Sequence, residues 1–88
     1  MNIRIARDEV RLRLSEEEAQ RLPAHGELIE TQAVVRFGVR LREGPPVLED
    51  LIAHVPRAAW QAALARAGKK DAGIYAPGLA VEIDAFKR

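Results

Sequence analysis

Alternating hydrophobic and polar residues predict a chain rich in β-strands, because successive side chains of a strand point to opposite faces. The pattern is clearest over 35–42, where Val35, Phe37, Val39 and Leu41 alternate with Arg36, Gly38, Arg40 and Arg42. Shorter runs of this kind predict strands at 3–5, 10–14, 27–31, 51–55, 72–76 and 79–83. Residues 27–42 form either one bent strand or a hairpin about Thr31-Gln32-Ala33, and the pattern leaves both open.

The segment 51–68 predicts a strand that leads directly into a helix, and we expect the rest of the chain to pack around it. The strand buries one face and leaves Ile52 and His54 partly covered on the other. Pro56 fixes φ and lacks the N–H, so it suits the first helical position.

Beyond Pro56, the hydrophobic residues share one face of the predicted helix: Trp60, Ala63, Leu64 and Ala67. Truncating a buried Trp60 to Ala would cost about 3 to 5 kcal/mol. Gly68 is expected to end the helix, with Lys69 and Lys70 at the negative end of its dipole.

A shorter helix is predicted after the second strand. Ser15 and Glu18 have the spacing of a capping box, in which each side chain binds a free backbone N–H at the helix start. Glu16, Glu17 and Glu18 all lie near the positive end of the helix dipole. Pro23 is expected to stop this helix at Leu22.

The two halves of the chain have the same predicted order of strand, helix and strand, and Glu43-Gly44-Pro45-Pro46 is the clearest loop between them. We therefore expect a single α+β domain over 1–88, with half-repeats at 1–42 and 47–88. About six mostly antiparallel strands would form a small sheet or barrel with two helices, in a pseudo-twofold arrangement. Phe86 could return to the core.

Composition excludes several classes of protein. The chain has 88 residues, a formal net charge of +1 and no cysteine, so disulfides, thiolate metal sites and thiol catalysis are excluded. We expect no signal peptide, because the first residues are charged from Arg4 onward and lack a long apolar core, and no later apolar run approaches the roughly 20 residues of a membrane span. We expect a cytoplasmic protein with no membrane contact, and a homodimer because so small a chain gains core by association.

No residue pattern indicates catalysis, a metal or a cofactor. His54 lies near Glu49 and Asp50, but His25 is the only other imidazole and a metal site needs several converging ligands. The glutamates after Ser15 are explained by capping, and the glycines form no phosphate-binding motif. We expect no enzyme; a small hydrolase or isomerase would require a polar pocket around His54.

Arginine is the residue type that could carry function. Five arginines project from the polar sides of predicted strands: Arg4, Arg11, Arg13, Arg36 and Arg40. If those strands are neighbours, the arginines form one face that could bind phosphates. In the alternative, which we favour, they pair across strands with acidic residues and cover a solvated face. The acidic candidates are Glu9, Glu27, Glu30 and Glu82.

The stretches IRIARDEVRLRLSEEEAQRL, HVPRAAWQAAL and GIYAPGLAVEIDAFKR resemble a family of small bacterial proteins of unknown function, which implies no activity. Each unit of strand, helix and strand is also similar to the swapped-hairpin fold of AbrB-type and MazE-type transcriptional regulators. Val55-Pro56-Arg57 matches the Pro and basic helix start of that fold, and Lys70-Asp71-Ala72-Gly73 approximates its Gly-Asp turn. Ser15-Glu16 places an acid at the corresponding start in the first half.

Two functions follow from these observations. The first is a small non-enzymatic binding or accessory protein of unknown role. The alternative is a DNA-binding transcriptional regulator or antitoxin-like protein with an AbrB-type fold, which would contact DNA through the five arginines. Nucleic acid is the less favoured partner because the net charge is near zero.

Overall fold

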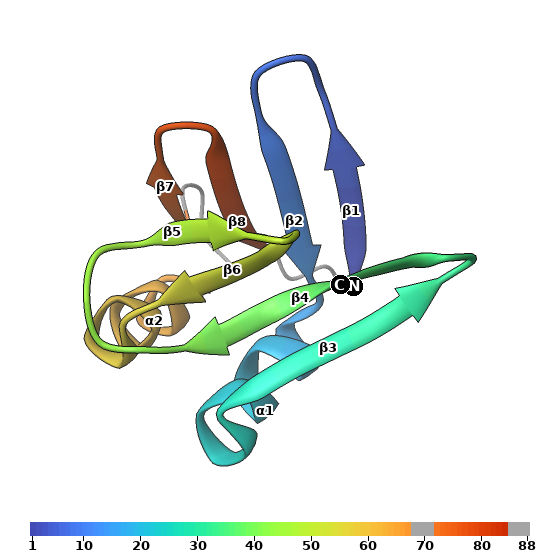
Figure 1. Ribbon diagram of the computed structural model, residues 1–88. Coiled ribbons are helices and arrows are strands. Elements are labelled where there is room, and N and C mark those ends of the chain that lie inside the picture. Colours follow the sequence, from blue (N-terminus) through green and yellow to red (C-terminus); the bar gives the residue numbers. More distant parts are fainter. Residues whose placement is uncertain (68–71, 85–88) are drawn as a thin grey trace.

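The computed structural model describes residues 1–67 and 72–84, which form eight strands and two helices (Figure 1). The strands are β1 (Asn2–Ile5), β2 (Val10–Leu14), β3 (Glu27–Gln32), β4 (Val35–Leu41), β5 (Val47–Glu49), β6 (Ile52–Val55), β7 (Gly73–Ala76) and β8 (Leu79–Ile83). The helices are α1 (Glu16–His25) and α2 (Arg57–Ala65). Neither described helix has the length and apolar character of a membrane span. The expected helix end at Gly68, the two lysines after it and the core contact of Phe86 lie outside the described residues.

The strands form two open four-stranded sheets. Sheet A has the order β1-β2-β8-β7 and sheet B the order β3-β4-β6-β5. The outer pairs are antiparallel, whereas β2 pairs with β8 and β4 with β6 in parallel. The α+β class is confirmed, but the expected count of about six strands is wrong, and the described strands do not close a barrel.

The strand order has a twofold relation between the halves of the chain. The first half runs β1-β2-α1-β3-β4 and the second runs β5-β6-α2-β7-β8. Replacing each strand of sheet A by its counterpart converts 1-2-8-7 into 5-6-4-3, which is the order of sheet B read backwards. Each sheet therefore contains one hairpin from each half, and neither half forms a complete sheet alone.

The sequence underestimates the number of strands because two tight turns between strands contain no glycine. Residues 27–42 form a hairpin, which settles the alternative left open by the sequence, and Ala33 in its turn has φ of 56°. Asp50 and Leu51 join β5 to β6 with φ of 52° and 65°. Two successive positive φ values match the twist of a hairpin. The expectation that Leu51 belongs to the strand is therefore wrong, because it lies in the turn.

Helix α1 starts as expected and ends later than expected. Ser15 Oγ accepts a hydrogen bond from the Glu18 N–H at 3.1 Å, and Glu18 Oε1 accepts one from the Ser15 N–H at 2.9 Å, which confirms the capping box. The helix continues through Pro23 to His25 and is capped by Gly26 with φ of 80°. Pro23 removes one N–H, whose usual acceptor is the carbonyl of Ala19, but it does not stop the helix.

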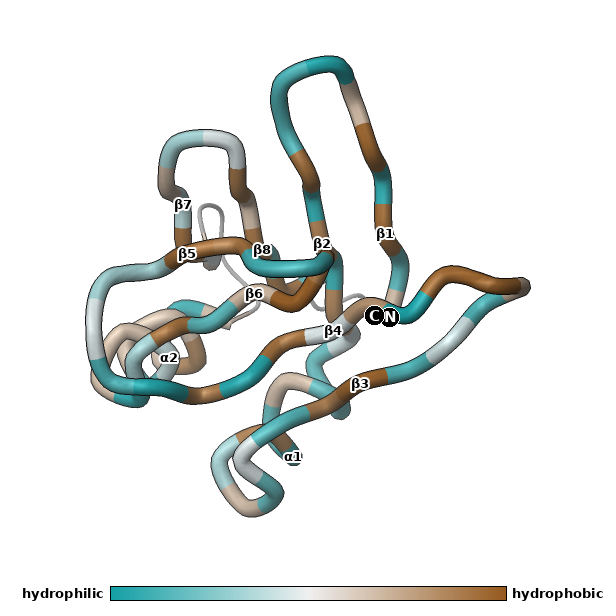
Figure 2. The backbone as a smooth tube through the Cα atoms, viewed as in Figure 1, coloured by the Kyte–Doolittle hydropathy of each residue, from teal (hydrophilic) through white to brown (hydrophobic). Residues whose placement is uncertain are grey.

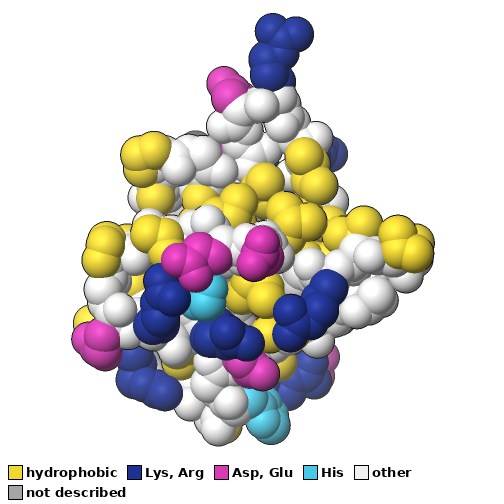
Figure 3. Space-filling model, viewed as in Figure 1, with side chains coloured by type: hydrophobic (Ala, Val, Ile, Leu, Met, Phe, Trp, Pro, Cys, Tyr) yellow, Lys and Arg dark blue, Asp and Glu magenta, His cyan; other side chains and the backbone are white. Residues whose placement is uncertain are grey.

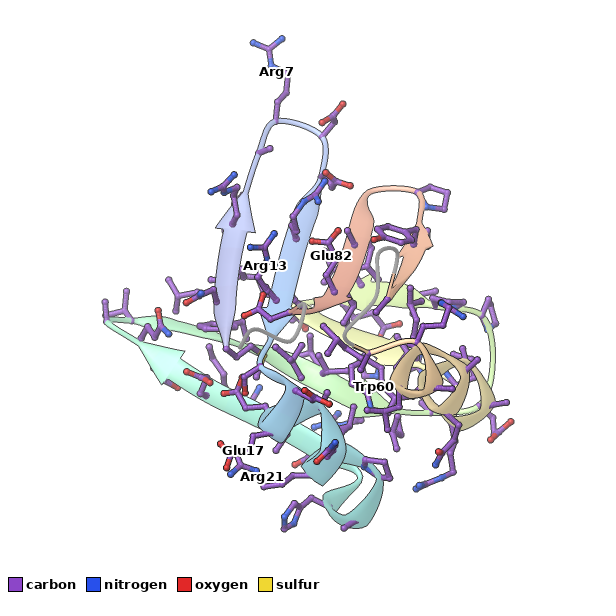
Figure 4. The ribbon with its side chains drawn as sticks, turned by 180° about the vertical axis from the view of Figure 1, so that it is seen from behind. Arg7, Arg13, Glu17, Arg21, Trp60 and Glu82 are labelled. Atoms are coloured by element: carbon purple, nitrogen blue, oxygen red, sulfur yellow. The ribbon has the colours of Figure 1, made fainter. Side chains whose placement is uncertain are left out.

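Helix α2 carries the tryptophan into the core, as expected. Pro56 is the N-cap with extended backbone, so the helix begins at Arg57, one residue later than expected. Trp60 is fully buried, and Figure 4 shows it between the helices and the sheets. The same core cluster contains Leu12 and Leu14 of sheet A and Phe37 and Val39 of sheet B.

Along the strands, hydropathy alternates as the sequence predicts, which is visible over β1 and β2 in Figure 2. Strand β6 differs because all four of its residues are buried, including both Ile52 and His54. The expectation that one side of this strand is only partly covered is therefore wrong. On that side, Glu49 of the neighbouring β5 lies 3.5 Å from His54.

Candidate functional site

The five candidate arginines lie on two different sheets. Arg4, Arg11 and Arg13 belong to β1 and β2 of sheet A, whereas Arg36 and Arg40 belong to β4 of sheet B. In their sheets, β2 is flanked by β1 and β8, and β4 is flanked by β3 and β6. The strands are not neighbours, so the condition for one contiguous arginine stripe is not met.

In sheet A, strand register brings three arginines onto one face. Arg4 lies directly opposite Arg11 across the hairpin, and Arg13 lies opposite Asn2 on one side and Glu82 of β8 on the other. Residues paired across an antiparallel hairpin share a face. We call the surface of Arg4, Arg11, Arg13 and Glu82 the arginine face.

A groove with a volume of about 360 Å³ lies on the arginine face, at the β1 side. Its lining residues are Asn2, Ile3, Arg4, Arg11 and Arg13. Sequence reasoning identified the arginines but missed Asn2. Extending the alternation of the first strand by one residue, from Arg4 back to Asn2, would have found it.

Acidic side chains neutralise the part of the arginine face that lies toward β8. Arg11 is 3.0 Å from Glu82 and 3.1 Å from Glu9. The hydrogen bond that Arg11 donates to Glu9, and then the charge of Glu82, raise the pKa of Arg11. Arg13 lies 3.6 Å from Glu82 and 3.3 Å from Asp84, and Figure 4 shows Arg13 and Glu82 side by side. The pairs with Glu82 are cross-strand contacts of the favoured alternative, whereas Glu9 is only two residues from Arg11.

Arg4 is the exception on this face. It is exposed, and within residues 1–67 and 72–84 no carboxylate forms an ion pair with it. The acids of the face lie beyond β2 from Arg4 or in the turn of the hairpin. Positive charge therefore remains at the β1 side of the groove, next to the free edge of the sheet.

The outer face of sheet B carries basic and acidic groups in close alternation, which Figure 3 shows over β3 to β6. Arg40 Nε lies 2.7 Å from Glu27 Oε1, and Arg42 Nη1 lies 3.4 Å from Glu49 Oε1. Arg36 on the same strand is exposed, with no ion pair to another described residue. Of the four glutamates expected to pair with arginines, Glu30 instead lies 3.6 Å from the Met1 ammonium.

His54 lies beneath these charged side chains and is 5% exposed, whereas the sequence predicted a surface or half-buried histidine. Its Nε2 is 3.5 Å from Glu49 Oε1, and its Nδ1 has no hydrogen-bond partner among the residues that the structure describes. Burial lowers the pKa of His54, and the charges of Arg42 and Arg40 lower it further against the opposing charge of Glu49. In turn, the hydrogen bond from Arg42 lowers the pKa of Glu49.

Among the described residues, no three His, Asp or Glu side chains gather in a way that could hold a metal ion. Glu16, Glu17 and Glu18 stand at the start of α1, where Glu18 completes the capping box. Among the described residues, the groove beside β1 carries an arginine, Arg4, that lacks an acidic partner, and this groove is the candidate site for recognition.

Comparison of the chain with models of known families, with curated proteins and with solved structures finds no significant match. Function therefore has to be inferred from the chemistry of the surface.

Proposed function

We propose that this chain is a non-enzymatic binding module that holds an acidic segment of a partner protein in the groove beside β1. The supporting observation is the position of Arg4, which lines the groove and has no carboxylate partner among the described residues. An exposed cation without a partner can gain an ion pair on binding without breaking one in the free protein.

The neighbouring Arg11 and Arg13 mainly shape the groove, because their charge is already paired with acidic side chains. Arg11 and Arg13 are held by Glu82, which also accepts a hydrogen bond from the Tyr75 hydroxyl at 2.9 Å. Side chains fixed in this way lose little conformational freedom when a ligand arrives. They therefore form a stable wall of the groove, and Arg4 supplies the free charge.

A matched pair of charge reversals tests this proposal. Arg4→Glu and Arg36→Glu change the net charge equally, and each replaces an exposed arginine that forms no ion pair with a described residue. The probe is a fluorescently labelled polyglutamate peptide, and the readout is its affinity by anisotropy at low salt. We expect Arg4→Glu to weaken binding about tenfold, with a much smaller effect of Arg36→Glu. Equal weakening by both variants would mean that only net charge matters, and would refute the proposal.

Self-association is part of the proposal. A chain of 88 residues buries a modest share of its surface on folding, and association of two chains would add to the core. Light scattering on the purified protein should give twice the 9.8 kDa mass of one chain. The mass of a monomer at all concentrations would remove this part of the proposal.

A second candidate function is DNA binding as a transcriptional regulator. It is supported by the pairing of β2 with β8 and of β4 with β6, which places a hairpin of each half against the other half, as a swapped-hairpin fold would. A regulator should bind duplex DNA with an affinity that falls steeply as salt increases. Absence of binding at low salt would remove this candidate.

A further inference from the structure

The free edge of β1 offers backbone groups to an incoming strand. In sheet A, β1 pairs only with β2, so the other side of its backbone has no strand partner among the described residues (Figure 1). An edge of this kind is a template on which an extended segment can add as a further strand. The groove of the arginine face lies at this edge, because Asn2, Ile3 and Arg4 line it.

The two faces of β1 would select different side chains. Asn2 and Arg4 share the arginine face with Arg11 and Arg13. Ile3 lies opposite the fully buried Leu12, so Ile3 and Ile5 are on the core side, where Ile5 remains 60% exposed. A strand placed beside β1 would therefore meet positive charge on one face and apolar surface on the other.

We infer that β1 binds an extended segment of a partner in which acidic and apolar residues alternate, and that this segment extends sheet A by one strand. The acidic side chains would lie along Arg4, and the apolar ones would cover Ile3 and Ile5. Because side chains of a strand alternate between faces, alternation in the ligand satisfies both faces at once. This inference rests on the proposed function and adds the backbone geometry and the sequence pattern of the ligand.

Arg4 also argues against a second copy of β1 as the occupant. Two antiparallel copies that keep their faces aligned would bring the two Arg4 side chains onto one face, opposite or close to each other. Like charges in such positions destabilise strand pairing. An acidic strand in the same place would be attracted.

The other described sheet edges lack this combination. Strand β5 has three residues, and β7 begins with Gly73, which has no side chain for recognition. Strand β3 carries Glu27 and Glu30, so an acidic segment would be repelled there. The β1 edge combines a groove, a cation without an ion pair and an exposed apolar side chain.

The test uses the full chain and a short labelled peptide of alternating glutamate and valine, blocked at both ends. One control has the same composition, with all glutamates before all valines. Two others carry N-methyl groups on alternate amides, on one strand edge or on the opposite edge. We expect the alternating peptide to bind at least about tenfold tighter than the block peptide. Methylation of one edge should abolish binding, whereas methylation of the other should leave it intact.

A second pair of variants tests the apolar side of the site. Ile5→Lys should weaken binding of the alternating peptide about tenfold, while Val34→Lys, at another exposed apolar position, should leave it unchanged. The substituted side chains are both exposed, so both variants should keep the fold.

The outcomes separate this inference from the proposed function. If all peptides bind equally well and Arg4→Glu weakens them all, binding of acidic segments in the groove is supported and strand addition is refuted. If no peptide binds, both are refuted. If the protein is a dimer that Ile5→Lys dissociates, β1 is occupied by a second copy and the inference is refuted.

Discussion

The indole Nε1 of Trp60 donates a hydrogen bond to the backbone oxygen of Ala19 across 3.0 Å, in the buried interior. Ala19 lies four residues before Pro23 in α1, so its oxygen is the one that the missing N–H of Pro23 would have occupied. The proline of one helix thus frees an acceptor for the tryptophan of the other. A buried indole N–H without a partner would be costly, and this contact satisfies both groups.

Substitution of both partners tests this relationship. Trp60→Phe should destabilise the protein, with about 1 to 3 kcal/mol of the loss coming from the Ala19 carbonyl left without a donor. Pro23→Ala restores an N–H to α1 that can bond to the Ala19 carbonyl. The substitution should therefore stabilise the Trp60→Phe protein more than it stabilises the wild-type protein. Urea unfolding followed by circular dichroism measures all four proteins of the cycle. Equal gains from Pro23→Ala in both backgrounds would show that the two sites are not coupled.

Gly38 is required by the close approach of β3 to β4. A Cβ at this position would lie 2.2 Å from the Leu28 oxygen and 2.7 Å from the Ile29 Cα, both backbone atoms that cannot move independently. Gly38→Ala should therefore lower the free energy of unfolding by about 1 to 3 kcal/mol.

Gly26→Ala is the matched comparison for that substitution. Gly26 has φ of 80°, and a Cβ added there would meet no atom within 4 Å, so its replacement adds backbone strain of about 1 kcal/mol and no clash. Both variants are measured by urea unfolding. A loss at Gly38 no larger than that at Gly26 would contradict the close approach of the two strands.

The stability of the fold should depend on pH through His54. In the unfolded chain the imidazole titrates near its ordinary value of 6.5, whereas burial and then the charges of Arg42 and Arg40 lower its pKa in the folded state. The unfolded state therefore takes up a proton first. The free energy of unfolding should fall as the pH drops below 6.5, until the pKa of the folded state is passed.

His54→Gln removes the titrating group and should flatten this part of the pH profile. Glu49 also has a lowered pKa, but its contribution is lost only as the pH falls below its ordinary value of 4.5, so the two effects occupy different pH ranges. The measurement is urea unfolding over a pH series. A His54→Gln protein that keeps the wild-type slope below pH 6.5 would refute the assignment to this histidine.

The parts of the fold that depend on local patterns could be predicted from the sequence. The alternation over 35–41 gave the strand and its buried face, and the spacing of Ser15 and Glu18 gave the helix cap. The apolar stripe of α2 placed Trp60 in the core. Each of these features is decided by residues close together in the chain.

Features decided by distant partners were predicted poorly. Pro23 was expected to end α1, and the acceptor it frees is used by Trp60, which lies far along the chain. The turn between β5 and β6 has positive φ at Asp50, a residue type that tolerates it, and also at Leu51, which gives no sign of a turn, so β5 was missed.

The candidate site shows the same division. Arg4 and Arg11 lie on the polar side of one local hairpin, and the alternation predicted that side for both residues. The separation of these residues from Arg36 depends on which strands adjoin in the sheets, and alternation within a strand contains no information on strand order.

The binding account is tested most directly by mapping where an acidic segment contacts the protein. The measurement is a titration of the isotopically labelled chain with the alternating glutamate and valine peptide, followed through backbone amide chemical shifts. The account predicts shift changes concentrated in Asn2–Ile5 and in the facing residues of Val10–Leu14. Changes centred on the Arg36 and Arg40 face of Val35–Leu41, with β1 unaffected, would contradict it.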